Sequence, residues 1–188
     1  MSKICQTTLP HYFSSRLRSG NSLLRLHLPD DTIDYLTAFL VRQALSPSID
    51  LKSPMGVMFL QAMLEGNNQP KMQQVGETVL FVSGHFPEFL TKQAYSRQYY
   101  WGLGQGAFAN LGKEHAAVAL HFTACIDAIM YTSESLLSAS PLTLHELASN
   151  NGGVPPSKEA IRMLHRTSSH EPSSDYSFVS SSKDLLPL

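Results

Sequence analysis

The sequence predicts an all-α protein: an irregular multi-helix bundle over residues 1–166, followed by a disordered C-terminal tail at 167–188. Apolar residues recur at steps of three and four over most of the first 166 residues, which is the period of an amphipathic helix. Residues that favour helix starts precede several of these segments. The tail is rich in serine and poor in apolar side chains, so it cannot bury enough surface to offset the entropy lost on ordering. We therefore expect one domain of about six to eight helices.

The first helix we expect covers 30–45, where two acidic residues precede apolar side chains and favour the positive end of the helix dipole. A short helix is expected over 53–66, between a Ser-Pro start signal and a glycine. A third covers 70–84. The stretch 78–82 alone would also suit a strand, but the helical period begins before it.

The next predicted helix covers 96–112, with Ser96 as its cap. It contains Gly102, Gly104 and Gly106, although each glycine costs a helix about 1 kcal/mol relative to alanine. Because Gly102 and Gly106 are one turn apart, we expect another helix backbone to approach closely at these two positions.

The longest periodic segment, 113–139, predicts one central helix that mixes small and large residues on a buried stripe. Thr143 begins a short helix with the spacing of a capping box. After a Gly-Pro break, Ser157 caps a last helix that ends near Arg166.

Composition narrows the classes of partner and location. Fourteen basic and fifteen acidic residues give a formal net charge of −1, which argues against nucleic acid as a partner. No apolar run reaches the roughly 18 to 20 residues of a membrane helix, so we expect no membrane insertion. Only two cysteines, Cys5 and Cys125, and no secretory leader favour a cytoplasmic location. Charged residues make up only 15%, which indicates an additional buried surface such as an oligomer interface.

The glycine run GLGQG at 102–106 does not predict a nucleotide cofactor. Its third glycine comes one residue too early for the dinucleotide-binding fingerprint, and the segment before it reads as helix rather than strand. The apparent P-loop that follows has Ala107 at its first position and Glu114 at its last, where glycine and a hydroxyl residue are needed.

Two further patterns fall short of a chemical site. His121 and Cys125 are one helical turn apart and suit two zinc ligands, but the sequence has no second Cys/His pair, so we expect no metal. Ser83 precedes glycine and His85, yet it lacks the flanking glycines and the preceding strand of a nucleophile elbow. We therefore assign no catalytic residue.

The aromatic residues near 99 allow two interpretations. They either contact a ligand or a partner, as amphipathic rings often do at interfaces, or they belong to the core. The candidate interaction or ligand surface comprises Ser83, His85, Tyr99, Tyr100, Trp101, Gly102 and Gly106.

Part of the chain resembles a known group of sequences. Residues 80–88 read LFVSGHFPE, and they are followed by a Tyr-Tyr pair at 99–100, by a Leu-Gly pair at 103–104 and by Ala-Phe at 107–108. This pattern resembles a group of uncharacterised bacterial proteins with a phrase close to LFVSGFFPE, then YY, a glycine and AY. The resemblance extends to 31–40 and 72–79; it implies a small cytosolic helical protein and supplies no catalytic residue. His85 and Phe108 depart from the pattern of that group.

The leading hypothesis is a non-enzymatic protein–protein interaction protein, either homo-oligomeric or a small subunit of a bacterial assembly. It depends on the low charge, on the helix that carries both glycines and aromatic residues, and on the incomplete catalytic patterns. The alternative is a helical enzyme or small-ligand-binding domain with a pocket near Ser83, His85 and Tyr100.

Overall fold

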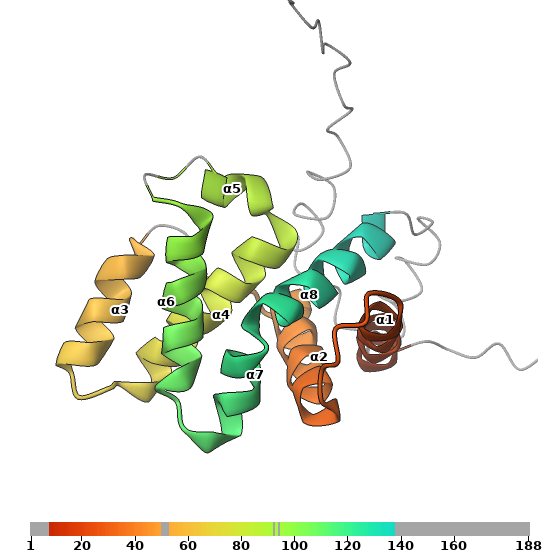
Figure 1. Ribbon diagram of the computed structural model, residues 1–188, viewed down its shortest axis with the longest axis horizontal. Helices are drawn as coiled ribbons and strands as arrows, with labels where there is room; N and C mark the ends of the chain where they lie inside the picture. The colour runs from red at the N-terminus through yellow and green to blue at the C-terminus, as the bar shows by residue number, and fades with distance from the viewer. Residues whose placement is uncertain (1–7, 50–52, 92, 94, 138–188) are drawn as a thin grey trace, which may run out of the picture.

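The computed structural model describes residues 8–49, 53–91, 93 and 95–137, with side chains as far as residue 133. Over these residues the chain forms eight α-helices and one short 3-10 helix and contains no strand, which confirms the predicted all-α class (Figure 1). The helices are α1 (Leu9–Leu23), α2 (Asp30–Leu45), α3 (Met55–Leu64), α4 (Gln69–His85), α5 (Pro87–Thr91), α6 (Arg97–Ala109), η1 (Lys113–His115), α7 (Ala116–Leu120) and α8 (Phe122–Leu137).

Four predicted helices correspond to α2, α3, α4 and α6. The predicted cap of α6 is confirmed, because the Ser96 hydroxyl accepts a hydrogen bond from the backbone N–H of Tyr99 at 3.3 Å. Two helices, α1 and α5, were not expected from the sequence. The helices predicted to begin at Thr143 and Ser157, and the tail at 167–188, lie outside the described residues.

The prediction of one continuous helix over 113–139 is wrong. The helix breaks at His121, and the segments Lys113–Leu120 and Phe122–Ser133 are inclined to each other by 72°. The bend lets Val118 and Ala119 be buried on α7 while Phe122 enters the core at the start of α8. Taken together, the two segments have the length and composition of a membrane span, but no single helix in the described ranges does.

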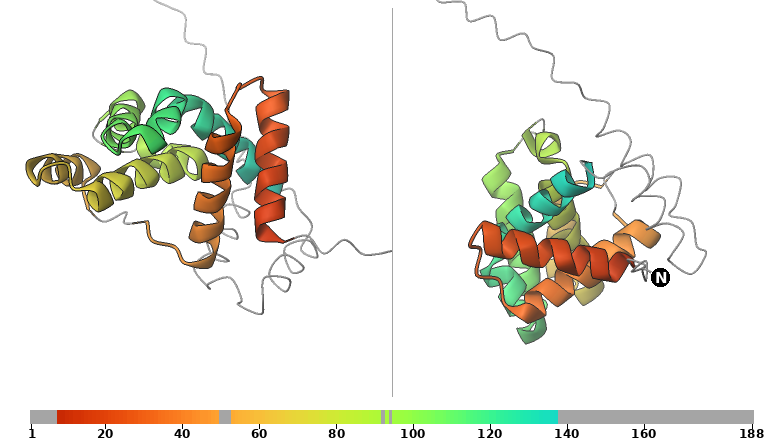
Figure 2. Two further views of the ribbon diagram at one scale, coloured as in Figure 1. Left: turned by 90° about the horizontal axis from the view of Figure 1, so that it is seen from below. Right: turned by 90° about the vertical axis from the view of Figure 1, so that its right-hand side faces the viewer.

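Helix α4 occupies the centre of the fold. Ten of its residues are buried, and it packs against α6, α8, α3 and α5. Figure 2 shows α3 projecting at one end of the molecule, whereas α1 and α2 lie side by side at the other. The largest fully buried side chains come from six of the helices and include Leu17, Phe39, Leu80, Phe108 and Phe122.

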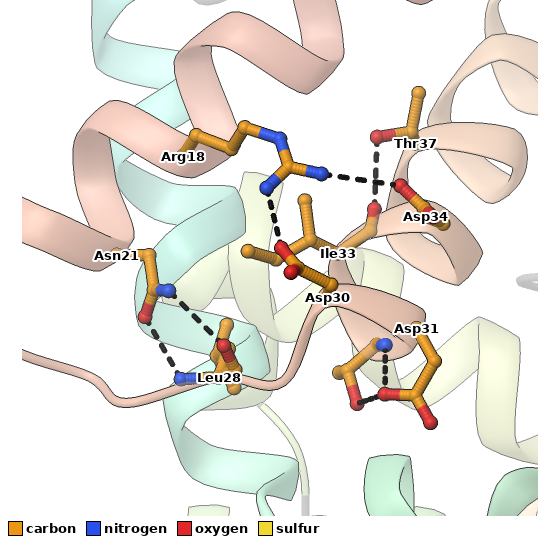
Figure 3. A network of polar contacts seen from close by, with 9 residues as sticks. Arg18, Asn21, Leu28, Asp30, Asp31, Ile33, Asp34 and Thr37 are labelled. Carbon is orange, nitrogen blue, oxygen red and sulfur yellow. Dashed lines mark hydrogen bonds and ion pairs between the residues drawn. The ribbon is translucent and has the colours of Figure 1, made fainter.

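The side chain of Asn21 closes the corner between α1 and α2 by forming two hydrogen bonds with the backbone of Leu28 (Figure 3). The Asn21 side-chain amide donates to the carbonyl of Leu28 at 3.1 Å, and its oxygen accepts from the Leu28 N–H at 2.9 Å. Leu28 is buried, so its backbone groups need these partners. Arg18 also bridges the helices, through Asp30 at 2.5 Å and Asp34 at 3.5 Å, but these pairs are exposed and contribute little.

We predict that Asn21→Ala lowers the free energy of unfolding by about 1–3 kcal/mol, because both backbone groups of Leu28 lose their partners. Urea unfolding followed by circular dichroism measures the change. Arg18→Ala is the matched control from the same helix, with an expected loss below about 1 kcal/mol. Equal losses in the two variants would contradict the role given to Asn21.

Candidate functional site

Ser83 lies in the contact between α4 and α6 rather than at a surface. Its side chain is buried, and its hydroxyl accepts a hydrogen bond from the indole N–H of Trp101 at 3.1 Å. The bond joins residues 18 positions apart and satisfies the only polar atom of the partly buried indole ring. Ser83 and Trp101 therefore serve the packing of two helices.

His85 contacts a different helix. Its Nδ1 lies 2.5 Å from the hydroxyl oxygen of Ser133 on α8, and this hydroxyl also donates to the carbonyl of Ile129 at 2.9 Å. Since a hydroxyl has one proton to donate, His85 Nδ1 is the donor to Ser133 whenever Ser133 donates to Ile129. The other ring nitrogen, Nε2, is buried and has no partner among the described residues. Burial lowers the pKa of His85 to about 4, so the ring is neutral at physiological pH.

The two residues point to different neighbours for a geometric reason. Residues two positions apart on a helix do not share a face, so Ser83 meets α6 while His85 meets α8. Two surface hollows are present. One, of about 770 Å³, is lined by residues of α1, and the other, of about 300 Å³, is lined by residues of α4 and of the segment after α2. Neither hollow includes Ser83, His85 or Tyr100. Ser83 and His85 therefore contact different helices, and neither of these two hollows joins them to Tyr100.

The tyrosines divide between core and surface. Tyr100 is buried, and burial, followed by the neighbouring Tyr99 and Tyr95, raises the pKa of its phenol. Tyr99 and Tyr95 are exposed, and their ring centroids lie 4.6 Å apart. The Tyr99 hydroxyl lies over Gly56 of α3, where a β-carbon would be 2.6 Å from it. The core interpretation therefore holds for Tyr100, whereas Tyr99 is exposed and its contact with a ligand or partner stays a prediction.

The expected close helix approach at Gly102 and Gly106 is wrong, because it occurs at Gly104. A β-carbon on Gly102 would meet open space, and one on Gly106 would make an ordinary contact with Phe59 at 3.5 Å. A β-carbon on Gly104 would lie 2.9 Å from the Cβ of Val79 on α4 and would overlap Phe122 on α8. The inward face of α6 is thus the one that carries Gly104, Ala107 and Phe108.

A buried carboxylate joins α2 to α4. Glu77 Oε1 accepts hydrogen bonds from the Tyr35 hydroxyl at 3.0 Å and from the Gln73 amide at 2.8 Å, and it pairs with Arg42 at 2.5 Å. Burial and then the Glu77 charge raise the pKa of Tyr35, so its phenol keeps the donated proton. Sequence reasoning did not single out Glu77, although an acidic residue at an inward position of an apolar helix is a signal for a buried pair.

The metal pair considered from the sequence lies at the bend between α7 and α8. Cys125 is fully buried, and burial raises the pKa of its thiol to about 12, so the thiol stays protonated. Within the described ranges, no group of three or more histidine, cysteine, aspartate or glutamate side chains is placed to hold a metal ion. His121 and Cys125 therefore have no third ligand in that part of the chain.

Helix α3 is apolar on two faces, but only one of them is covered. It buries Met55 and Ala62 against α4 and α6. A second stripe at helical spacing faces outward, and the exposed Tyr95 and Tyr99 adjoin it at Gly56. We call this set the α3 surface; its members, with exposures between 40% and 87%, are Val57, Leu60, Met63, Leu64, Tyr95 and Tyr99.

Comparisons with known proteins do not identify the chain. No protein-family model, no curated protein and no solved structure matches it. The resemblance of residues 80–88 to a bacterial group thus stays a prediction.

We predict opposite effects of alanine at two glycines of α6. Gly104→Ala should lower the free energy of unfolding by about 1–3 kcal/mol, because its methyl group overlaps Phe122 and Val79. Gly102→Ala should raise it by about 0.5–1 kcal/mol, because the methyl group meets open space and restricts the unfolded chain. Urea unfolding of the two variants measures both. A Gly104→Ala protein as stable as Gly102→Ala would refute the assignment of the inward face.

We predict that His85 makes the protein less stable in acid. The unfolded histidine takes up a proton near pH 6.5 and the folded one only near pH 4, so the free energy of unfolding falls as the pH is lowered through this interval. The full loss is about 3 kcal/mol, and below pH 4 the histidine adds nothing further. Urea unfolding at about pH 7 and about pH 5 compares the protein with His85→Gln, which does not titrate. An identical pH dependence in both proteins would exclude His85 as the source.

Proposed function

We propose that this chain is a non-enzymatic protein–protein interaction protein and that the α3 surface is its contact surface. The observation that carries the proposal is an uncovered apolar stripe on a helix without a charged residue from Met55 to Leu64. Contiguous exposed apolar side chains of this kind mark sites of protein association. A helix that is apolar on all sides is normally buried on all sides.

Exposure of single apolar residues elsewhere does not carry the same meaning. Leu23, Leu24 and Leu120 are also exposed, but they lie at the ends of α1 and α7 and form no stripe along a helix. On α3, by contrast, Val57, Leu60 and Leu64 are spaced at three and four residues and share one face. Covering one leucine side chain contributes about 1.5–3 kcal/mol, so a partner gains most from Leu60 and Leu64.

The contacts of Ser83 and His85 and the raised pKa of Tyr100 support a non-enzymatic role. Ser83 is occupied by Trp101, and His85 is bonded to Ser133, so neither is placed to activate the other. The hydroxyl of the buried Tyr100 has a raised pKa and is a poor base at neutral pH. These contacts hold helices together, and they leave the α3 surface as the part of the described chain suited to recognition.

We predict that the double variant Leu60→Glu/Leu64→Glu loses the physiological partner. The two carboxylates would have to be desolvated on binding, and both positions are too exposed for the change to disturb the core. The full-length tagged chain is captured from its native host, and stoichiometric partners are identified by mass spectrometry. Leu120→Glu is the matched control, since this leucine is 76% exposed and lies outside the α3 surface.

Capture of the same partner by the wild-type chain and the Leu120→Glu variant, but not by the double variant, is the expected result. A partner retained by the double variant would contradict the proposed surface. Recovery of the chain alone with a bound metal or small molecule would contradict the proposed function. Circular dichroism of the double variant checks that its fold is intact.

A further inference from the structure

We propose that the hollow of about 300 Å³ between α4 and the segment after α2 binds a small organic amine through its primary ammonium group. We call it the α4 hollow. The inference goes beyond the proposed function and does not depend on the α3 surface. It depends on one oxygen of the buried Glu77 carboxylate, on two amide groups beside it and on the size of the hollow.

The carboxylate of Glu77 keeps one oxygen available to the α4 hollow. The hydrogen bonds from Tyr35 and Gln73 and the ion pair with Arg42 all involve Oε1. Oε2 accepts no hydrogen bond from the described residues and, unlike the hydroxyl of Thr78, it is not sealed from solvent. Because Glu77 lines the hollow, Oε2 can be reached from it. A carboxylate has about four acceptor positions, so Oε2 can accept further donors.

Two neighbouring side chains on α4 supply further acceptors at the hollow. Gln73 donates its amide N–H to Glu77, which leaves its amide oxygen as an acceptor. Gln74 lines the same hollow, and its amide forms no hydrogen bond with another described residue. A primary ammonium group has three donors and no acceptor. It therefore matches one carboxylate oxygen and two amide oxygens.

The size and the walls of the hollow limit the rest of the ligand. Sites for small molecules have volumes of about 300–1,000 Å³, so the α4 hollow is at the lower end of that range. Ile49 and Pro70 add apolar surface to its lining. An amine with a short alkyl part is thus the class of molecule that fits.

The charges around the hollow set the strength of the expected binding. Arg42 already neutralises Glu77, although its side chain is 44% exposed and solvent weakens its effect on a second cation. Asp50 and Lys52 follow Ile49 in the sequence, and their opposite charges add no net charge. We therefore expect a dissociation constant of about 1–10 mM. An amine bound so weakly dissociates during purification, so this binding does not interfere with the capture of a protein partner.

Titration of the ¹⁵N-labelled full chain with ethylammonium chloride, followed by two-dimensional NMR, tests the site. The backbone amide signals of Ser48 and of Gln73, Gln74, Glu77 and Thr78 should shift and saturate over about 0–50 mM. Tetramethylammonium chloride is the matched control, since it has the same charge but no N–H donor. Wild-type signals that do not saturate, or that respond equally to both salts, would overturn the inference.

Two variants test which residues hold the ammonium group. Gln74→Leu removes an acceptor without breaking a hydrogen bond of the described residues, and it should raise the dissociation constant at least about fivefold. Gln98→Leu is the control, because Gln98 is exposed on α6 and does not line the hollow. Glu77→Gln should abolish saturation, with circular dichroism to check the fold. Wild-type affinity in Gln74→Leu would exclude this site.

A third probe, Nα-acetyl-lysine methylamide, distinguishes a free amine from the lysine side chain of a protein. It should bind no more tightly than ethylammonium. A dissociation constant about tenfold lower would assign the hollow to a protein lysine and overturn the free amine as its ligand. Failure of this inference leaves the proposed function untouched, because Leu60→Glu/Leu64→Glu alters the α3 surface and none of the residues that line the α4 hollow.

Discussion

Glycines let α4, α6 and α8 approach closely enough to share one core. β-Carbons on Gly76, Gly84 and Gly104 would each collide with a large side chain of a neighbouring helix. The side chains that fill these spaces are Phe108, Ile129 and Phe122, respectively. Since protein interiors are close-packed, these contacts fix the distances between the three helices. Each glycine lowers the helix propensity of its segment. The packing of a buried ring or branched side chain against the glycine offsets that loss.

The same packing decides what the polar residues of these helices do. Gly84 allows α8 to approach α4 closely at the turn that contains His85. Gly104, one turn after Trp101, allows α6 to approach α4 closely. At such short separations a buried polar atom that reaches the neighbouring helix bonds to it, because an unpaired buried polar group costs free energy. The Ser83–Trp101 and His85–Ser133 bonds follow from this requirement. Helix packing therefore explains the positions of Ser83, Trp101 and His85, which are candidate site residues in the sequence.

Sequence periodicity predicted the helical class and four of the helices, since a buried stripe leaves its period in the chain. It did not reveal the break at His121, because two short helices can carry apolar residues at nearly the same spacing as one long helix. Helix α1 was missed because serine, arginine and glycine dilute its few buried residues. The polar contacts join residues 18 to 48 positions apart, and local pattern contains no information on such pairs. Likewise, the apolar α3 was recognised as a helix, but which of its faces stays uncovered depends on where α4 and α6 lie.

The position of α3 separates association from folding. The helix is attached through one face, by Met55 and Ala62 and by the contact of Phe59 with Gly106, and its outer stripe touches none of the glycine contacts of the core. A partner can cover that stripe without moving α4, α6 or α8, so binding needs no rearrangement of the packed interior. Conversely, losing a partner exposes only side chains that the single chain already exposes. An apolar stripe on a peripheral helix is thus compatible with a stable monomer and with reversible assembly, which a stripe continuous with the core would not allow.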